Sequence, residues 1–130
     1  MAIIPLTRYH DIEFKHLYAS ALCLKEIAKI IRGSGIERDF QRWLLDRFRE
    51  IDDIESFSYV EVNKKRYEKI GEFFNITFRH KEKNVRILFS REENGKVNIL
   101  LCAMDEKKTK SDYKQLQRLA EKRLKEEREL

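Results

Sequence analysis

Apolar residues recur along the chain with two different periods, which divide it into helical and extended stretches. From about Phe14 to Arg32 they follow at spacings of three and four, the period of an amphipathic helix. Ser34-Gly35-Ile36-Glu37 has the S-x-x-E form of a capping box and predicts the start of a second helix, and Gly33 suits a left-handed helix cap. The expected inward stripes are Phe14, Leu17, Ala21, Leu24, Ala28 and Ile31, then Phe40, Trp43, Leu44, Phe48 and Ile51. This pattern predicts two antiparallel helices joined by a short turn.

The second half of the chain alternates apolar and polar residues, the period of β-strands. Phe74, Ile76 and Phe78 alternate with Asn75, Thr77 and Arg79, and Val85, Ile87 and Phe89 alternate with Arg86, Leu88 and Ser90. His80 to Asn84 is the expected hairpin loop. A third strand, Val97 to Met104, is apolar on both faces and should therefore be central or well covered. Asn94-Gly95 before it is a two-residue turn signal.

Other stretches give weaker signals. Ile3 and Ile4 could open a short strand, which Pro5 confines to an edge or ends. Phe57 to Val62 reads as a weak strand, and Tyr67 to Gly71 as a turn or a short helix.

Ser111 and Asp112 predict the start of a last helix, because a hydroxyl can cap free amides and an acid complements the positive helix end. Its expected inward stripe is Tyr113, Leu116, Ala120 and Leu124, and the charge-rich tail from Lys125 to Glu129 should fray. The predicted fold is therefore α+β in a single domain over residues 1–130: two N-terminal helices, an antiparallel β-sheet meander and a C-terminal helix.

The composition, 42% hydrophobic and 39% charged, is typical of a globular protein and not of a disordered one. No secretory signal or membrane-length apolar run is present, so a cytoplasmic location is expected. Cys23 and Cys102 lie amid apolar neighbours without a C-x-x-C pair, which favours two reduced, buried thiols over a disulfide or a metal site.

Positive charge is concentrated in two segments of the second half. Residues 64–91 and 107–130 carry net charges of +6 and +4, while the whole chain carries +5. If the fold joins these segments, they form a basic surface suited to a polyanion such as nucleic acid; otherwise the lysines simply line solvated faces.

The most informative junction is Asp105-Glu106-Lys107-Lys108-Thr109-Lys110-Ser111, between the last predicted strand and the last helix. Helix starts favour anions through their unpaired amides, so Lys107, Lys108 and Lys110 flank a plausible phosphate site. Asp105 and Glu106 have no acidic or histidine partners at ligand spacing, so neither a metal nor a cofactor is expected.

Arg79 and Arg86 should project from the same face at the hairpin end of the sheet, where they could bind a phosphate in bidentate fashion. Acid–base chemistry at a bound phosphate also needs a base to take up a proton and an acid to protonate the leaving oxygen. Lys107 with a lowered pKa, or His80, could supply one of them. The alternatives are surface salt bridges for the arginines, phosphate contact for the lysine and a solvent-exposed loop position for the histidine.

Taken in order, several motifs resemble the RelE/ParE superfamily of bacterial toxins, and most closely its phage-related, HigB-like branch. They are Phe78-Arg79, the strand Val85 to Phe89, the strand Ile99 to Leu101, and Lys107-Lys108-Thr109 before a helix rich in Lys and Arg. The resemblance covers residues 73–125. The sequence departs from the branch in carrying Ala103-Met104-Asp105-Glu106 where His and Phe often precede the lysine pair.

This resemblance implies a toxin of a type II toxin-antitoxin system that cleaves messenger RNA on the ribosome and is neutralised by a helix-turn-helix, HigA-like antitoxin. Arg86, Arg79, Lys107 and His80 are then the expected catalytic residues. The expected RNA-binding residues are Lys108, Lys110, Tyr113, Lys64 and Lys65, although Tyr113 lies on the helix stripe and could pack in the core instead. Two alternatives remain open: a non-catalytic toxin that inhibits a protein such as gyrase, and a basic RNA-binding module.

Overall fold

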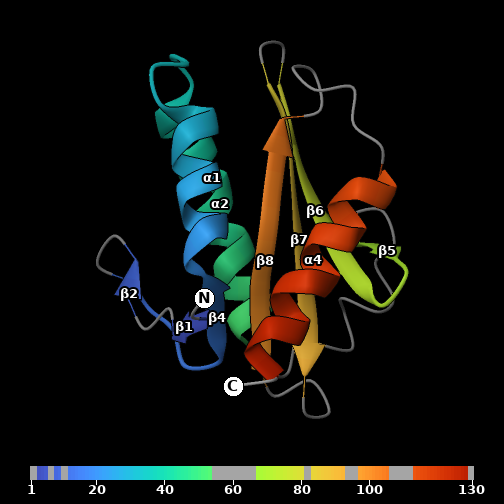
Figure 1. The fold of residues 1–130 in the computed structure, drawn as a ribbon. Helices are drawn as coiled ribbons and strands as arrows, with labels where there is room; N and C mark the ends of the chain where they lie inside the picture. Colours follow the sequence, from blue (N-terminus) through green and yellow to red (C-terminus); the bar gives the residue numbers. More distant parts are fainter. Residues whose placement is uncertain are drawn as a thin grey trace.

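The protein has an α+β fold, seen in a computed structural model that describes residues 3–5, 8–9, 12–53, 67–80, 83–92, 97–105 and 113–128 (Figure 1). The helices are α1 (Ala21–Ile31), α2 (Glu37–Asp52) and α4 (Tyr113–Arg128). The strands are β1 (Ile3–Pro5), β2 (Arg8–Tyr9), β3 (Ile12–Glu13), β4 (Leu17–Ser20), β5 (Glu68–Ile70), β6 (Phe73–Arg79), β7 (Asn84–Glu92) and β8 (Val97–Asp105). None of the helices in these ranges has the length and apolar character that crossing a membrane requires.

The strands of the main sheet lie in the order β1-β4-β8-β7-β6-β5, and β2 pairs with β3 separately. β6, β7 and β8 form the predicted antiparallel meander, with Thr77 opposite Arg86 and Arg86 opposite Met104. β8 is central and its residues Ile99 to Ala103 are buried, which confirms the expectation from its two apolar faces. Pro5 lies in the edge strand β1, as expected.

The first predicted helix is wrong at its start, because Leu17–Ser20 form the strand β4 and α1 begins only at Ala21. β4 runs parallel to β8, with Leu17 opposite Asn98 and Ala19 opposite Leu100. Leu17 and Ala19 are buried, so this stretch fits alternation as well as helical spacing. Pairing with the edge of β8 decides between the two, and the sheet is therefore mixed.

Residues 67–71 do not form the predicted turn or short helix, apart from the turn at Gly71, because Glu68–Ile70 form the strand β5. Glu68–Ile70 pair antiparallel with β6, placing Glu68 opposite Asn75, and Gly71 turns the chain into β6 at φ 61°. Tyr67, just before the strand, is buried and its hydroxyl donates to Glu50 of α2. This anchoring and the open edge of β6 hold the short stretch extended.

The turn between α1 and α2 confirms Gly33 as a left-handed residue, with φ 69°. The capping box is displaced, however, because α2 begins at Glu37 and not at Ser34. The Gly35 N–H donates to Glu37 Oε1 at 3.1 Å and the Ile36 N–H donates to Ser34 Oγ at 3.3 Å. Gly35, at φ 83°, keeps the chain out of the helix for these positions, so the two side chains satisfy turn amides instead.

The helices bury the sheet from two sides. The larger core joins α1 and α2 to Ile76, Ile87 and Phe89, while the smaller joins α4 to Leu88 and Leu101. In α4 the predicted stripe is confirmed for Leu116, Ala120 and Leu124, which are buried, and the helix continues to Arg128 where fraying was expected. The expected strand at 57–62, the Asn94-Gly95 turn and the Ser111-Asp112 cap lie outside the described residues.

A polar contact crosses the edge of β8 where β4 ends. β4 pairs no further than Leu100, and the Arg123 guanidinium of α4 donates to the next carbonyl, Leu101 O, at 2.7 Å. The same guanidinium donates to both carboxylate oxygens of Glu26 on α1, at 2.7 and 3.0 Å. Glu26 Oε1 also accepts the Ala103 N–H at 3.2 Å, so the pair satisfies backbone groups that a neighbouring strand would otherwise pair.

Candidate functional site

The hairpin end of β6 and β7 brings the two predicted arginines to one face. Arg86 lies opposite Thr77, and Arg79 lies two residues beyond Thr77, opposite Asn84. Because side chains alternate along a strand, Thr77, Arg79 and Arg86 project from the face that α4 covers elsewhere. In Figure 1 this end of the sheet extends beyond the start of α4. The sequence-based placement of the arginine pair is therefore confirmed.

Arg86 is held in a polar cluster and is only 7% exposed. Its Nη1 donates to Thr77 Oγ1 at 3.3 Å and lies 3.7 Å from Glu68 Oε2 on β5. Thr77 Oγ1 also accepts from Asn75 Nδ2 at 2.8 Å. The guanidinium is thus fixed by neighbouring strands, which suits a residue that must present charge in a defined position.

Arg79 differs from Arg86 in being exposed. Its side chain forms no hydrogen bond or ion pair within the described parts of the chain. Diagonal neighbours on paired strands lie about 7–8 Å apart, a distance that two arginine side chains can span to reach one anion. The site therefore combines one fixed and one adaptable guanidinium.

His80 does not join this pair. Its ring stacks on Phe78, with centroids 6.0 Å apart and planes at 8°, and Phe78 packs against Phe40 and Trp43 of α2. Phe78 belongs to the opposite face of β6 from Arg79, so the histidine is carried towards α2. The stacking places the His80 ring on the face of β6 opposite Arg79, and its role as acid or base stays a prediction.

All five lysines predicted for the site belong to segments that the structure does not describe. Lys107, Lys108, Lys110, Lys64 and Lys65 lie outside the described residues, and Tyr113 opens α4 but its side chain is also outside them. The ends of the lysine-rich connection are described, since β8 ends at Asp105 and α4 begins at Tyr113. Asp105 follows Met104, which lies opposite Arg86.

Asp105 closes β8 in a buried polar contact on the α1 side of the sheet. Its Oδ2 lies 3.3 Å from Lys83 Nζ, and its Oδ1 accepts the Asn84 N–H at 3.2 Å. A cavity of about 310 Å³ adjoins them, lined also by Glu26, Lys29, Ile30, Ala103 and Met104. The two contacts of Asp105 thus hold Lys83 and Asn84 against the end of β8.

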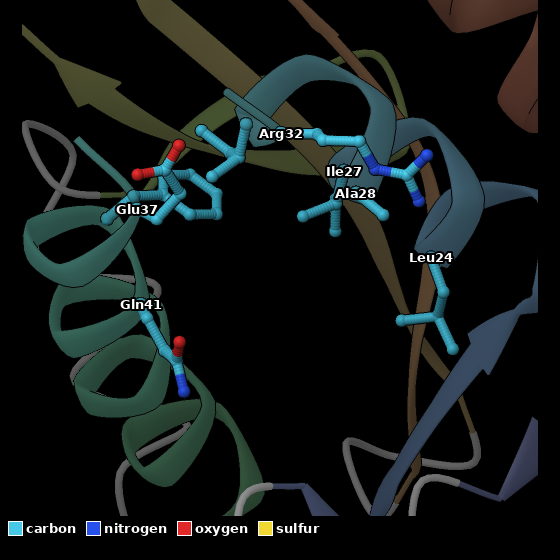
Figure 2. Close-up of a pocket in the computed structure, with 8 residues that line it drawn as sticks. Leu24, Ile27, Ala28, Arg32, Glu37 and Gln41 are labelled. Carbon is cyan, nitrogen blue, oxygen red and sulfur yellow. The ribbon is translucent and has the colours of Figure 1, made fainter. Parts of the chain in front are cut away.

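A second cavity, of about 350 Å³, lies between α1 and α2 (Figure 2). Leu24, Ile27, Ala28 and Arg32 line it from the α1 side, and Glu37 and Gln41 from the α2 side. Its surface is mainly apolar. Glu37 titrates there, and hydrogen bonding, first from the Gly35 N–H, holds the pKa of its carboxyl below the ordinary value. A carboxylate that is ionised at neutral pH is a poor proton donor, so Glu37 does not supply an acid to this cavity.

The two cysteines are buried and free, as expected. Burial raises the pKa of the Cys102 thiol to about 12, and burial together with neighbouring Cys102 raises that of Cys23 well above the ordinary value. Because the thiolate is the reactive form, neither group is a nucleophile in this fold.

Glu68 is the residue of the site that sequence reasoning missed. It entered the prediction only as part of a turn or short helix, whereas pairing of β5 with β6 places its carboxylate beside Arg86. Strand alternation could have indicated its face only if β5 had been predicted.

No protein-family model matches this chain, and neither a curated protein nor a solved structure matches it.

Proposed function

We propose that this protein is a toxin of the RelE/ParE type, closest to the HigB-like branch, and that it cleaves messenger RNA on the ribosome without a metal ion. The observation that carries the proposal is the arginine pair. Arg79 and Arg86 share one face at the hairpin end of the sheet. Arg86 lies opposite Met104, one residue before β8 ends and the lysine-rich connection begins. The α+β fold, with its meander between two N-terminal helices and a C-terminal one, agrees with the resemblance.

In this proposal the arginines bind the scissile phosphate and stabilise the charge that develops on it. Lys107 and Lys108 supply further positive charge, and a helix-turn-helix antitoxin neutralises the protein. His80 is no longer assigned a part, since its ring lies on Phe78. The proton transfers then fall to the lysine-rich segment or to groups of the ribosome.

The test is a cleavage assay with purified ribosomes, a defined message and mapped cut sites. Wild type should cut the message only when ribosomes are present, and Arg79→Ala should lower the rate by at least about ten-fold, the loss expected for one contact to a charged phosphate. Arg79 is exposed, so this change should leave the fold intact. Arg38→Ala, at an exposed arginine of α2, is the matched control and should cut at the wild-type rate.

A second candidate, binding without cleavage, is favoured by the separation of His80 from the arginines and by the carboxylate beside Arg86. A non-catalytic toxin would arrest growth while transcripts stay intact. Sequencing transcript ends during arrest separates the two, because mapped internal cuts support the nuclease and their absence removes it. DNA breaks during arrest would indicate gyrase as the target.

A further inference from the structure

We propose that Arg86 and Thr77 form a phosphate-binding site whose place is taken in the free protein by the carboxylate of Glu68. RNA phosphate would displace this carboxylate, so Glu68 lowers the affinity for RNA by competing for the same cation. The choice of RNA as the ligand rests on the function proposed above. The anion site itself rests only on the geometry of β5, β6 and β7.

The Arg86 guanidinium and the Thr77 hydroxyl are hydrogen-bonded neighbours, so one anion can contact both. Thr77 Oγ1 accepts hydrogen bonds from both Asn75 Nδ2 and Arg86 Nη1. A hydroxyl has two acceptor sites and one donor, so the Thr77 O–H can donate to a further acceptor. An anion next to Arg86 can receive that hydrogen bond, and Asn75, only 1% exposed, fixes the orientation of Thr77 from behind.

The carboxylate of Glu68 is placed to be exchanged. Its Oε2 lies 3.7 Å from Arg86 Nη1, whereas hydrogen-bonded guanidinium and carboxylate groups approach to about 2.7–2.9 Å. The side chain of Glu68 is 52% exposed, so water already solvates much of it and little is lost when it rotates away. By contrast, the Arg86 side chain is 8% exposed and stays in place.

The strand that carries Glu68 also favours exchange. β5 spans Glu68–Ile70 at the outer edge of the sheet. A phosphate that replaces the carboxylate meets the Thr77 hydroxyl, the Arg86 guanidinium and, diagonally, the exposed Arg79. An RNA phosphodiester carries the same single negative charge as the carboxylate, so its advantage comes from the hydrogen bond of the Thr77 hydroxyl and from the second cation, Arg79, on the same face.

The experiment compares Glu68→Gln with wild type for binding of a short, labelled single-stranded RNA by fluorescence anisotropy at low salt. Removing a unit charge about 4 Å away should tighten binding about five-fold. Glu72→Gln is the matched control, because Glu72 is an exposed glutamate four residues away and provides the same change in net charge. It should alter the affinity by less than two-fold.

Two further variants test the donors. Thr77→Val removes the hydroxyl at nearly constant shape and should weaken RNA binding, and Thr77→Ser should restore it. Thermal unfolding is followed for each variant, and Thr77→Ser keeps the test valid if the valine variant fails to fold. Equal tightening by Glu68→Gln and Glu72→Gln, or no tightening by either, would overturn the exchange.

Inorganic phosphate separates this inference from the proposed function. A ligand that binds the native state raises the melting temperature, so phosphate at constant ionic strength should stabilise Glu68→Gln more than wild type. If phosphate behaves in this way but RNA does not bind, the anion site stands and the RNA function fails. If RNA binds with the same affinity to both proteins and Glu68→Gln abolishes cleavage, the exchange is wrong and Glu68 belongs to the chemistry.

Discussion

Replacing Arg123 with methionine should destabilise the protein strongly, because one guanidinium connects three separate parts of the fold. Arg123 of α4 is 8% exposed and donates to both oxygens of Glu26 on α1 and to Leu101 O of β8. Burial lowers the pKa of the Arg123 guanidinium, but its hydrogen bond to Glu26 and the attraction between the two charges outweigh this and raise it. The residue therefore stays charged at any accessible pH.

The expected loss follows from the groups left behind. Methionine keeps part of the apolar packing of the side chain, but Leu101 O loses its donor and Glu26 retains only the Ala103 N–H among the contacts described above. An unsatisfied buried group costs about 1–3 kcal/mol, and breaking a buried ion pair from one side costs about 3–5 kcal/mol. Glu26 is partly exposed, so we expect a loss of about 3 kcal/mol and a fall in melting temperature of about 10 °C.

Urea unfolding followed by tryptophan fluorescence measures this loss. Trp43 is the single tryptophan and its ring lies 5.6 Å from that of Phe40, so its emission should change when the core opens. Lys122→Met, at an exposed position of the same helix, is the matched control and should stay within about 0.5 kcal/mol of wild type. Glu26→Gln and the double variant complete a cycle that should show coupling above about 1 kcal/mol. A loss below 0.5 kcal/mol for Arg123→Met, or additive effects, would refute the reasoning.

Three further predictions address other parts of the fold. Gly71→Ala should cost about 1–2 kcal/mol, because φ is 61° and the new methyl group would meet the Gln117 amide; Gly33→Ala, with open space around it, should cost less in the same urea assay. The pKa of Glu37 is lower in the native state than its unfolded value of about 4.3, so the ionised carboxylate stabilises the fold above about pH 4.3, and this stability is lost as the pH falls through the native pKa. Acidification should therefore destabilise wild type more than Glu37→Gln, as measured by circular dichroism. The Cys102 thiol, with its pKa of about 12, should react with iodoacetamide at pH 8 only after unfolding, and rapid labelling of the folded protein would contradict its burial.

Local periodicity predicted the elements whose partners are their neighbours in sequence. The alternation of Phe74, Ile76 and Phe78 gave both the strand and its buried face, and the short loop after it placed Arg79 and Arg86 together. A hairpin fixes register over a few residues, so the face of each side chain follows from counting. The same holds for the α4 stripe from Leu116 to Leu124, where the helical period alone selects the buried positions.

The elements that depend on distant partners could not be predicted in this way. Leu17 suits either a helix or a strand, and only the edge of β8, some 80 residues later, makes the stretch extended. Glu68 became visible only when β5 paired with β6, and with it the anionic partner of Arg86 was missed. His80 differs from these cases, because it lies two residues after Phe78 and counting along the strand already indicates the face of β6 opposite Arg79.

The buried polar residues on the α4 face of the sheet lower the stability of the fold, which argues that this face has a role besides packing. Asn75 and Ser90 are buried, and Asn75 Oδ1 and Ser90 Oγ lack a hydrogen-bond partner in the described part of the chain. Apolar residues at both positions would be expected to stabilise the fold, because an unsatisfied buried polar group costs free energy that a packed methyl group does not. Asn75 nevertheless orients Thr77, and Thr77 orients Arg86. Sequences depart from simple packing rules mainly at sites under functional constraint, and here the departure leads to the same guanidinium that the fold presents at its open end.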